Sequence, residues 1–158
     1  MTAINVHIGE VKIAKKGELL QAILGSCVGI GIIWKKNRIC GLAHCLLPSN
    51  DVPTFNIGGR FVTQAIPSLI ALMKIKPENI EEIAAVVAGG GNMTNPGASD
   101  PTDLVGSKNF ETAILELGKL GIRIVHSESG GEEGRKIFVS SLDFSFRVEK
   151  IPRIAEVA

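Results

Sequence analysis

The sequence contains no tyrosine and one tryptophan, and six phenylalanines complete its aromatic residues among 158 positions. Its core must therefore be built mainly from isoleucine, valine, leucine and alanine. Net charge is nearly absent as well, at +1 with neutral histidines. Proteins that bind nucleic acid usually carry a concentrated basic face. The charge balance therefore argues against a nucleic-acid partner.

No apolar run reaches the roughly 18 residues that a membrane-spanning helix needs. The first residues also lack the basic stretch and apolar block of a secretory signal. Three cysteines are an odd number for a disulfide framework, and free thiols in a reducing cytosol are the simplest interpretation. We therefore expect a cytoplasmic protein without direct membrane insertion. Its length suits one domain over residues 1–158, since domains cluster around ~100–150 residues.

The hydrophobic periodicity changes along the chain from two to between three and four. Strands are expected over 4–13 (with a break near Gly9), 18–24, 28–34, 39–47, 83–88, 122–127, 135–140 and 144–150. A helix is expected over 59–74, either kinked at Pro67 or beginning there. A second helix should be capped by Asp103 and end at Gly121. This order predicts an α/β (α+β) fold, a mixed sheet or layered β-sandwich flanked by two main helices.

Cys27 lies at a sharp junction, directly after Gly25-Ser26 and between two apolar strands. A lone cysteine is more often a small core residue than a nucleophile. A cysteine attacks only as the thiolate, and its unperturbed pKa of ~8.5 requires a neighbouring base or positive charge. The hypothesis that Cys27 is a nucleophile therefore depends on whether a base can reach it.

His44 is the candidate base if strands 28–34 and 39–47 form an antiparallel hairpin around residues 35–38. Paired residue numbers then sum to 73, which places His44 opposite Gly29 and diagonal to Cys27 on one sheet face. Gly29 would leave room for the imidazole. A slip of one residue would put the two groups on opposite faces. Without this neighbour, His44 would be interpreted as a buried core histidine.

Cys40, His44 and Cys45 invite comparison with a zinc site. Residues 40 and 44 share a strand face but 45 does not, and structural zinc sites normally close with four ligands, so no metal is expected. The cluster Gly89–Gly91 lacks the spacing and the lysine of a phosphate loop. The segment Gly130–Arg135 is either a plain turn or a loop that faces the substrate, with Arg135 paired to the structure.

Several of these segments resemble the chemoreceptor glutamine deamidase (CheD) family. The similarity comprises five ordered segments, Leu24–Val28, Gly41–Pro48, Gly90–Met93, Val105–Asn109 and Gly130–Arg135. The resemblance extends over nearly the whole chain. The resemblance implies a β-sandwich flanked by helices that hydrolyses particular glutamine side chains on methyl-accepting chemoreceptors to glutamate. Some members also cleave receptor methyl esters, and many bind a phosphatase of the chemotaxis system.

The family roles carry over to Cys27 as nucleophile and His44 as base. The family's third catalytic position, a threonine six residues before the cysteine, falls on Gln21, whose main chain could still orient a histidine. The thiolate would attack the glutamine carbonyl, and N–H groups of Ser26 and Cys27 would stabilise the oxyanion. Hydrolysis of the thioester would then give glutamate without any cofactor.

Two alternatives stay open at this point. The glutamine at position 21 is compatible with a catalytically weak or inactive binding module of the chemotaxis system. A thiol hydrolase or redox protein with another substrate is the other possibility. A redox role would require a resolving cysteine close to Cys27, and the predicted pairing offers no clear candidate.

Overall fold

The computed structural model describes residues 2–50, 56–91 and 105–152, and these residues form two mixed sheets. The smaller sheet has the order β1 (Thr2–Asn5), β3 (Glu18–Leu24), β8 (Gly134–Ser140) and β9 (Ser145–Ile151). The larger sheet has the order β2 (Val11–Ala14), β5 (Ile39–Cys45), β4 (Val28–Trp34), β6 (Ala84–Gly89) and β7 (Arg123–Ser129). The pairs β1–β3 and β6–β7 are parallel, and the other neighbours are antiparallel.

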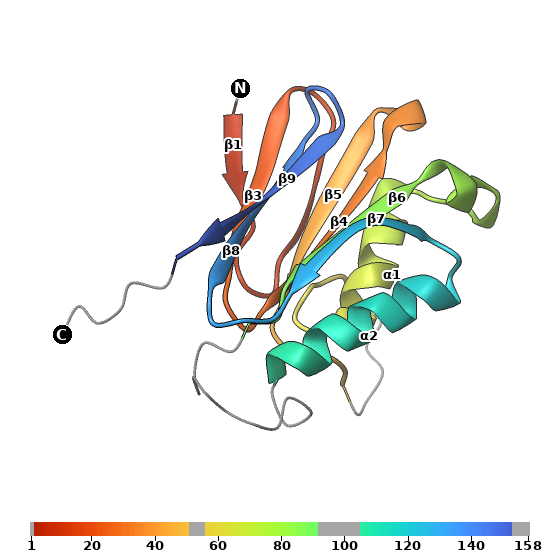
Figure 1. The fold of residues 1–158 in the computed structure, drawn as a ribbon. Helices are drawn as coiled ribbons and strands as arrows, with labels where there is room; N and C mark the ends of the chain where they lie inside the picture. The colour runs from red at the N-terminus through yellow and green to blue at the C-terminus, as the bar shows by residue number, and fades with distance from the viewer. Residues whose placement is uncertain (1, 51–55, 92–104, 153–158) are drawn as a thin grey trace.

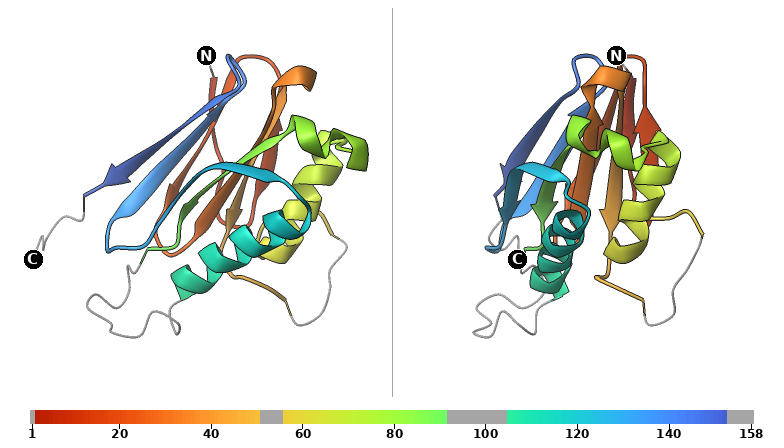
Figure 2. Two further views of the ribbon diagram at one scale, coloured as in Figure 1. Left: turned by 45° about the vertical axis from the view of Figure 1, so that its right-hand side comes forward. Right: turned by 90° about the vertical axis from the view of Figure 1, so that its right-hand side faces the viewer.

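Two α-helices cover the outer face of the larger sheet, as Figure 1 and Figure 2 show. These are α1 (Val62–Met73) and α2 (Val105–Lys119). A short 3₁₀ turn, η1 (Lys35–Asn37), connects β4 to β5, and another, η2 (Pro77–Glu82), lies between α1 and β6. One apolar cluster lies between the helices and the larger sheet, and a second lies between the two sheets. The predicted class, a layered β-sandwich flanked by two helices, is confirmed.

Strand β4 is buried along its whole length because it contributes to both clusters. Val28, Ile30 and Ile32 pack toward the helices. On the other face, a methyl group added at Gly31 would lie 2.9 Å from Cγ2 of Val139. Glycine at this position therefore lets the two sheets approach each other closely.

The expected strand over 4–13 is interrupted near Gly9, as predicted, but its two parts, β1 and β2, lie in different sheets. Gly9 has a φ of +85°, which favours glycine and turns the chain between the sheets. The N–H of Val6 donates to the carbonyl of Gln21 in the smaller sheet, and the N–H of Gly9 donates to His44 in the larger one. The connection 6–10 therefore bridges the open side of the sandwich near His44.

Helix α1 runs through Pro67, so the alternative of a helix beginning at Pro67 is wrong. Proline removes one backbone donor from the helix. Burial of Ala65, Ile66 and Leu69 against the larger sheet offsets this loss. The proposed cap of the second helix, Asp103, lies outside the described residues, whereas the end of that helix before Gly121 is as expected.

Candidate active site

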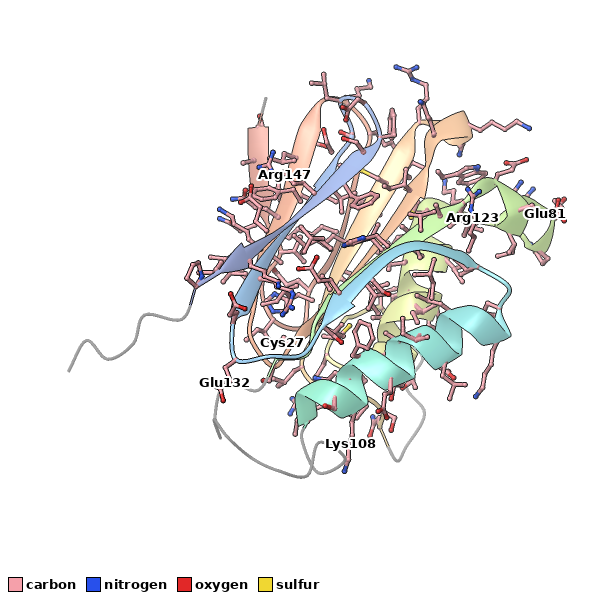
Figure 3. All side chains as sticks on the ribbon, in the orientation of Figure 1. Cys27, Glu81, Lys108, Arg123, Glu132 and Arg147 are labelled. Carbon is pink, nitrogen blue, oxygen red and sulfur yellow. The ribbon has the colours of Figure 1, made fainter. Side chains whose placement is uncertain are left out.

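Cys27 lies in the short connection between β3 and β4, where the chain passes from one sheet to the other. Figure 3 shows it at the end of the sandwich that also carries Glu132 and Lys108. The connection is fixed by glycine backbone: the N–H of Gly90 donates to the carbonyl of Cys27 at 2.9 Å, and Gly91 donates to Gly25 at 2.9 Å. The glycine cluster after β6 therefore forms tight backbone contacts beside Cys27.

Gly89 explains why this cluster tolerates no side chain at its first position. Its φ is +110°, and an added methyl group would collide with the carbonyl oxygen of Cys27. Such a collision with backbone cannot be relieved by rotating a side chain. Any other residue at position 89 would have to displace Cys27 or the end of β6.

His44 lies opposite Gly29 in the β4–β5 ladder, so the predicted hairpin register is confirmed. Cys27 belongs to the core between the sheets together with Leu42. Since His44 follows Leu42 by two residues in one strand, it shares that face. The space above Gly29 is not left for the imidazole, however, because Leu24 and Ile137 fill it. The structure thus corrects that detail of the sequence prediction.

The imidazole of His44 is held through one nitrogen only. Nδ1 lies 2.8 Å from the carbonyl oxygen of Val6, which can only accept, so Nδ1 carries the proton and Nε2 is left as an acceptor. Nε2 is buried and has no hydrogen-bond partner among the described residues. Cys27 therefore does not hydrogen-bond to His44 in this state, and the nitrogen is available for a proton.

Both groups are neutral at pH 7 in this arrangement. Burial raises the pKa of the Cys27 thiol above its ordinary 9.0. Burial also lowers the pKa of His44 below 6.5, although its hydrogen bond to Val6 opposes this shift. A preformed thiolate–imidazolium pair is thus disfavoured, and any thiolate must arise by proton transfer during the reaction.

Gln21 reaches His44 only through Val6. Its side-chain amide donates to Oδ1 of Asn5 at 2.8 Å, and its main-chain carbonyl accepts the N–H of Val6 at 2.8 Å. The carbonyl that orients His44 is therefore that of Val6, which the sequence analysis did not single out. A main-chain role leaves no trace in side-chain type, so no signal in the sequence could have identified Val6.

Helix α2 contributes a second residue that the sequence analysis did not assign a role. The side chain of Asn109 is completely buried, and its Nδ2 donates to the carbonyls of Ser26 at 3.0 Å and Leu46 at 2.9 Å. Gly106, one turn earlier, packs directly on Gly90. In the sequence, the segment Val105–Asn109 stands out only through the family resemblance, and its asparagine is the available signal.

The loop before β8 completes the surroundings of Cys27. A methyl group added at Gly91 would lie 3.1 Å from the carbonyl oxygen of Glu133. Arg135 is 4% exposed and donates to Oε2 of Glu128 at 2.9 Å and to the carbonyl of Gly130 at 3.0 Å. The expected pairing of Arg135 with the structure is confirmed, and it holds this loop in shape beside Gly91.

Glu128 is the carboxylate that compensates the buried arginine. Its burial opposes ionisation, but hydrogen bonds from Arg135 and His126 outweigh that effect and lower the pKa of Glu128. A charged pair therefore persists at neutral pH. Met93 and Asn92, which complete the glycine segment of the resemblance, lie outside the described residues.

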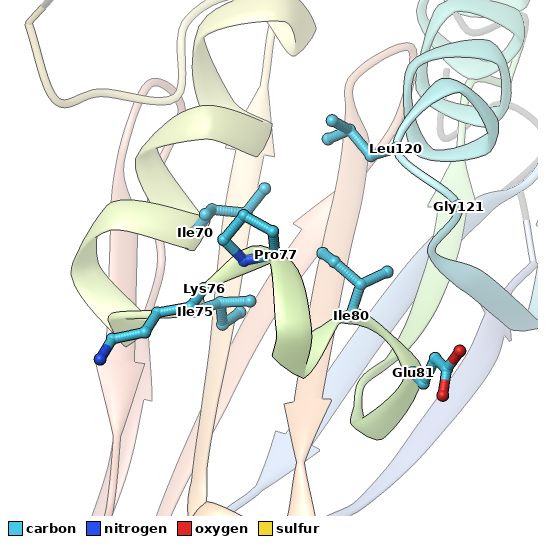
Figure 4. A pocket seen from close by; sticks show the side chains of 8 residues that line it. All are labelled: Ile70, Ile75, Lys76, Pro77, Ile80, Glu81, Leu120 and Gly121. Carbon is cyan, nitrogen blue, oxygen red and sulfur yellow. The ribbon is translucent and has the colours of Figure 1, made fainter.

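A pocket of about 550 Å³ lies beside His44, on the side of the 6–10 connection. Its lining includes His44 itself and the exposed side chains of Ile8 and Ile23. A second pocket, of about 520 Å³, lies between the ends of the two helices, where Figure 4 shows Ile70, Ile80 and Leu120 turned toward one another. At 1.5 Å per residue this second pocket is roughly 16 Å along α2 from Asn109, so it is separate from the site.

Comparisons with known proteins identify the chain's relatives. A profile described as CheD chemotactic sensory transduction matches residues 46–150. A Bdellovibrio bacteriovorus protein is 38% identical over 151 residues, covering 96% of both chains, and a Ruegeria protein is 37% identical over 98% of this chain and 95% of its own. The chain belongs to the CheD family. A CheD protein of Methanococcus maripaludis is 33% identical over 93% of this chain and 94% of its own.

These CheD relatives carry the name probable chemoreceptor glutamine deamidase. The profile match begins after His44, but the alignments with the full-length CheD proteins extend over nearly the whole chain. A crystal structure of a Neisseria meningitidis DUF152 protein is a far weaker match, with 13% identity, a TM-score of 0.43 and coverage of 77% of this chain and 52% of that one. Among the described residues, no helix combines the length and apolarity needed to cross a membrane.

Proposed function

We propose that this chain is a cytoplasmic protein-glutamine deamidase that converts specific glutamine side chains of methyl-accepting chemoreceptors into glutamate. The single observation that carries the chemistry is the buried, unpartnered Nε2 of His44 on the same sheet face as Cys27. The substrate class is supported by the CheD relatives, which are between 30% and 38% identical and are named probable chemoreceptor glutamine deamidases.

The reaction begins with two neutral groups. Substrate binding brings the glutamine carboxamide against Cys27, Nε2 of His44 takes the thiol proton, and Sγ forms a bond to the amide carbon. The hydrogen bond from Nδ1 to Val6 steadies the imidazolium that forms. That imidazolium gives its proton to the amide nitrogen, the C–N bond breaks, and ammonia leaves.

Water completes the cycle by cleaving the thioester. His44 takes a proton from the water, and the water oxygen bonds to the acyl carbon. The C–S bond then breaks to release glutamate, and His44 returns the proton to Sγ, which restores the Cys27 thiol. The main-chain N–H groups of Ser26 and Cys27 make no hydrogen bond with another described residue. They are therefore available to stabilise the oxyanion in both steps, where one donor contributes ~3–4 kcal/mol.

Deamidation replaces a neutral carboxamide by a carboxylate, so each turnover adds one negative charge to the receptor. A charge change of this kind shifts a two-state signalling equilibrium by local electrostatics. The new glutamate would also be available for methylation. We include in the proposal a chemotaxis-system phosphatase as a second partner, on the resemblance to the family.

The test is ammonia release from a purified receptor cytoplasmic fragment. We expect Cys27→Ala and His44→Ala to abolish release. Cys40→Ala is the matched control because Cys40 is a free, buried thiol in the same core, and this variant should retain release. Retained release by Cys27→Ala would contradict the proposal. A wild-type protein that binds the fragment without releasing ammonia would instead indicate the inactive binding module.

A further inference from the structure

Asn109 contacts the ends of β4 and β5, beyond the last residue pair of their ladder. The last pair of the β4–β5 ladder is Val28 with Cys45. Beyond it, the main-chain hydrogen bonds that the described residues make to the connection carrying Cys27 come from Gly90 and Gly91, on the β6 side. These bonds lie on the side away from β5, so they leave the spacing between Cys27 and the strand of His44 unfixed.

The side-chain amide of Asn109 joins the connection that carries Cys27 to the chain that follows His44. It donates to the carbonyl of Ser26, directly before Cys27, and to the carbonyl of Leu46, two residues after His44. Because both partners can only accept, the orientation of the amide is unambiguous. The two bonds join the diverging ends of β4 and β5 beyond the ladder.

The oxygen of this amide is in an unfavourable environment. Oδ1 of Asn109 is buried and has no hydrogen-bond partner among the described residues. A buried polar atom without a partner costs stability. An asparagine here is therefore poorly explained by stability alone, and its distinctive contribution is the pair of donated bonds.

The helix that carries Asn109 is firmly placed. Gly106 packs against the backbone of Gly90, and an added methyl group there would lie 2.7 Å from Gly90 and from the carbonyl oxygen of Gly91. Further along, Ala113 and Leu117 are anchored in the core against the larger sheet. The amide is thus held on a rigid element, as a positioning group requires.

We propose that Asn109 is a positioning residue that sets the distance between Cys27 and His44 through its bonds to Ser26 and Leu46. The inference rests on the proposed deamidase function for its kinetic consequence, but not for its geometric one. A displacement near 1 Å in a catalytic pair lowers turnover by about 10²-fold. We expect a loss of that order in kcat, with KM for the receptor fragment unchanged.

Two variants separate positioning from folding. Asn109→Ala removes the amide, and Asn109→Leu removes it while filling the volume with an apolar side chain of similar size. Ala113→Gly is the matched control, since it weakens the packing of the same helix but leaves the Asn109 amide and its two bonds to Ser26 and Leu46 in place. Both Asn109 variants should have a lower kcat, whereas Ala113→Gly should have a lower free energy of unfolding and an unchanged kcat. The proposal would be overturned if Ala113→Gly lowered kcat as much as the Asn109 variants do. It would also be overturned if both Asn109 variants kept the wild-type kcat.

A second readout needs no receptor. The rate at which iodoacetamide alkylates Cys27 is measured against pH in the wild type, His44→Ala and Asn109→Ala. We expect the wild type to show a rate component that titrates with His44, and both variants to lose it. If this rate component is absent from His44→Ala but present in Asn109→Ala, the positioning role of Asn109 is refuted. If the wild type deamidates nothing but the component depends on both residues, positioning stands and the proposed function fails.

Discussion

Replacing Gly106 by alanine would place a methyl carbon 2.7 Å from the carbonyl carbon and oxygen of Gly90 and from the oxygen of Gly91. Ordinary contacts begin near 3.4 Å, so α2 or the glycine segment must move by several tenths of an ångström. Overpacking of this kind costs ~1–3 kcal/mol. Glycine to alanine within a helix contributes up to ~1 kcal/mol of the opposite sign. The free energy of unfolding should fall by about 1–2 kcal/mol.

Gly118→Ala is the matched control, because it lies in the same helix and an added methyl group there meets no atom within 4 Å. It should raise the free energy of unfolding by ~0.5–1 kcal/mol. Equilibrium unfolding in urea compares the two variants. Gly106→Ala should also lower deamidation, since Gly90 donates to the carbonyl of Cys27. If Gly106→Ala is as stable as Gly118→Ala, the close packing of α2 against the glycine segment is refuted.

Three further predictions concern buried ionisable groups. Burial lowers the pKa of His44 below 6.5, so the unfolded chain binds a proton that the folded chain does not. The free energy of unfolding should therefore fall as the pH drops below 6.5, until the lowered pKa of His44 is passed. In urea unfolding measured at a series of pH values, His44→Gln should weaken this pH dependence. An unchanged pH dependence in His44→Gln would refute the lowered pKa. In the native protein iodoacetamide should modify Cys27 before Cys40, whose pKa burial raises to about 12, and peptide mapping that finds Cys40 first would contradict this. Arg135→Met should lower the free energy of unfolding by about 2–3 kcal/mol, because the hydrogen bonds of the guanidinium are lost. An unchanged free energy of unfolding would show that the arginine does not stabilise this loop.

The hairpin of the site could be predicted because its information is local. The turn at 35–38 sets which residues of the two strands face each other, so His44 opposite Gly29 follows by counting outward from it. The layered fold was predictable for a similar reason, since each strand and helix shows its own periodicity. The break near Gly9 was predicted, but the placement of its two sides in different sheets depends on long-range bonds to Gln21 and His44. The local pattern also left open whether a helix runs through Pro67, and burial against the larger sheet stabilises the continuous helix.

The parts of the site that escaped prediction depend on long-range contacts. Val6 orients His44 with its carbonyl, and a carbonyl is common to every residue type. Asn109 acts across more than 60 positions of sequence, on Ser26 and Leu46. The close approach of Gly89 to the carbonyl of Cys27 likewise joins two segments that are distant in the sequence. Such contacts become visible only when the chain is folded.

Detection of an acyl-enzyme intermediate on Cys27 would test the proposed deamidation chemistry directly. The protein is mixed with a receptor cytoplasmic fragment, quenched in acid within the turnover time, digested and mapped by mass spectrometry. We expect a receptor peptide joined through its glutamine side chain to Cys27 as a thioester that hydroxylamine cleaves, with Cys40 and Cys45 unmodified. Glutamate formation with no adduct at Cys27, and with full activity retained in Cys27→Ala, would contradict it.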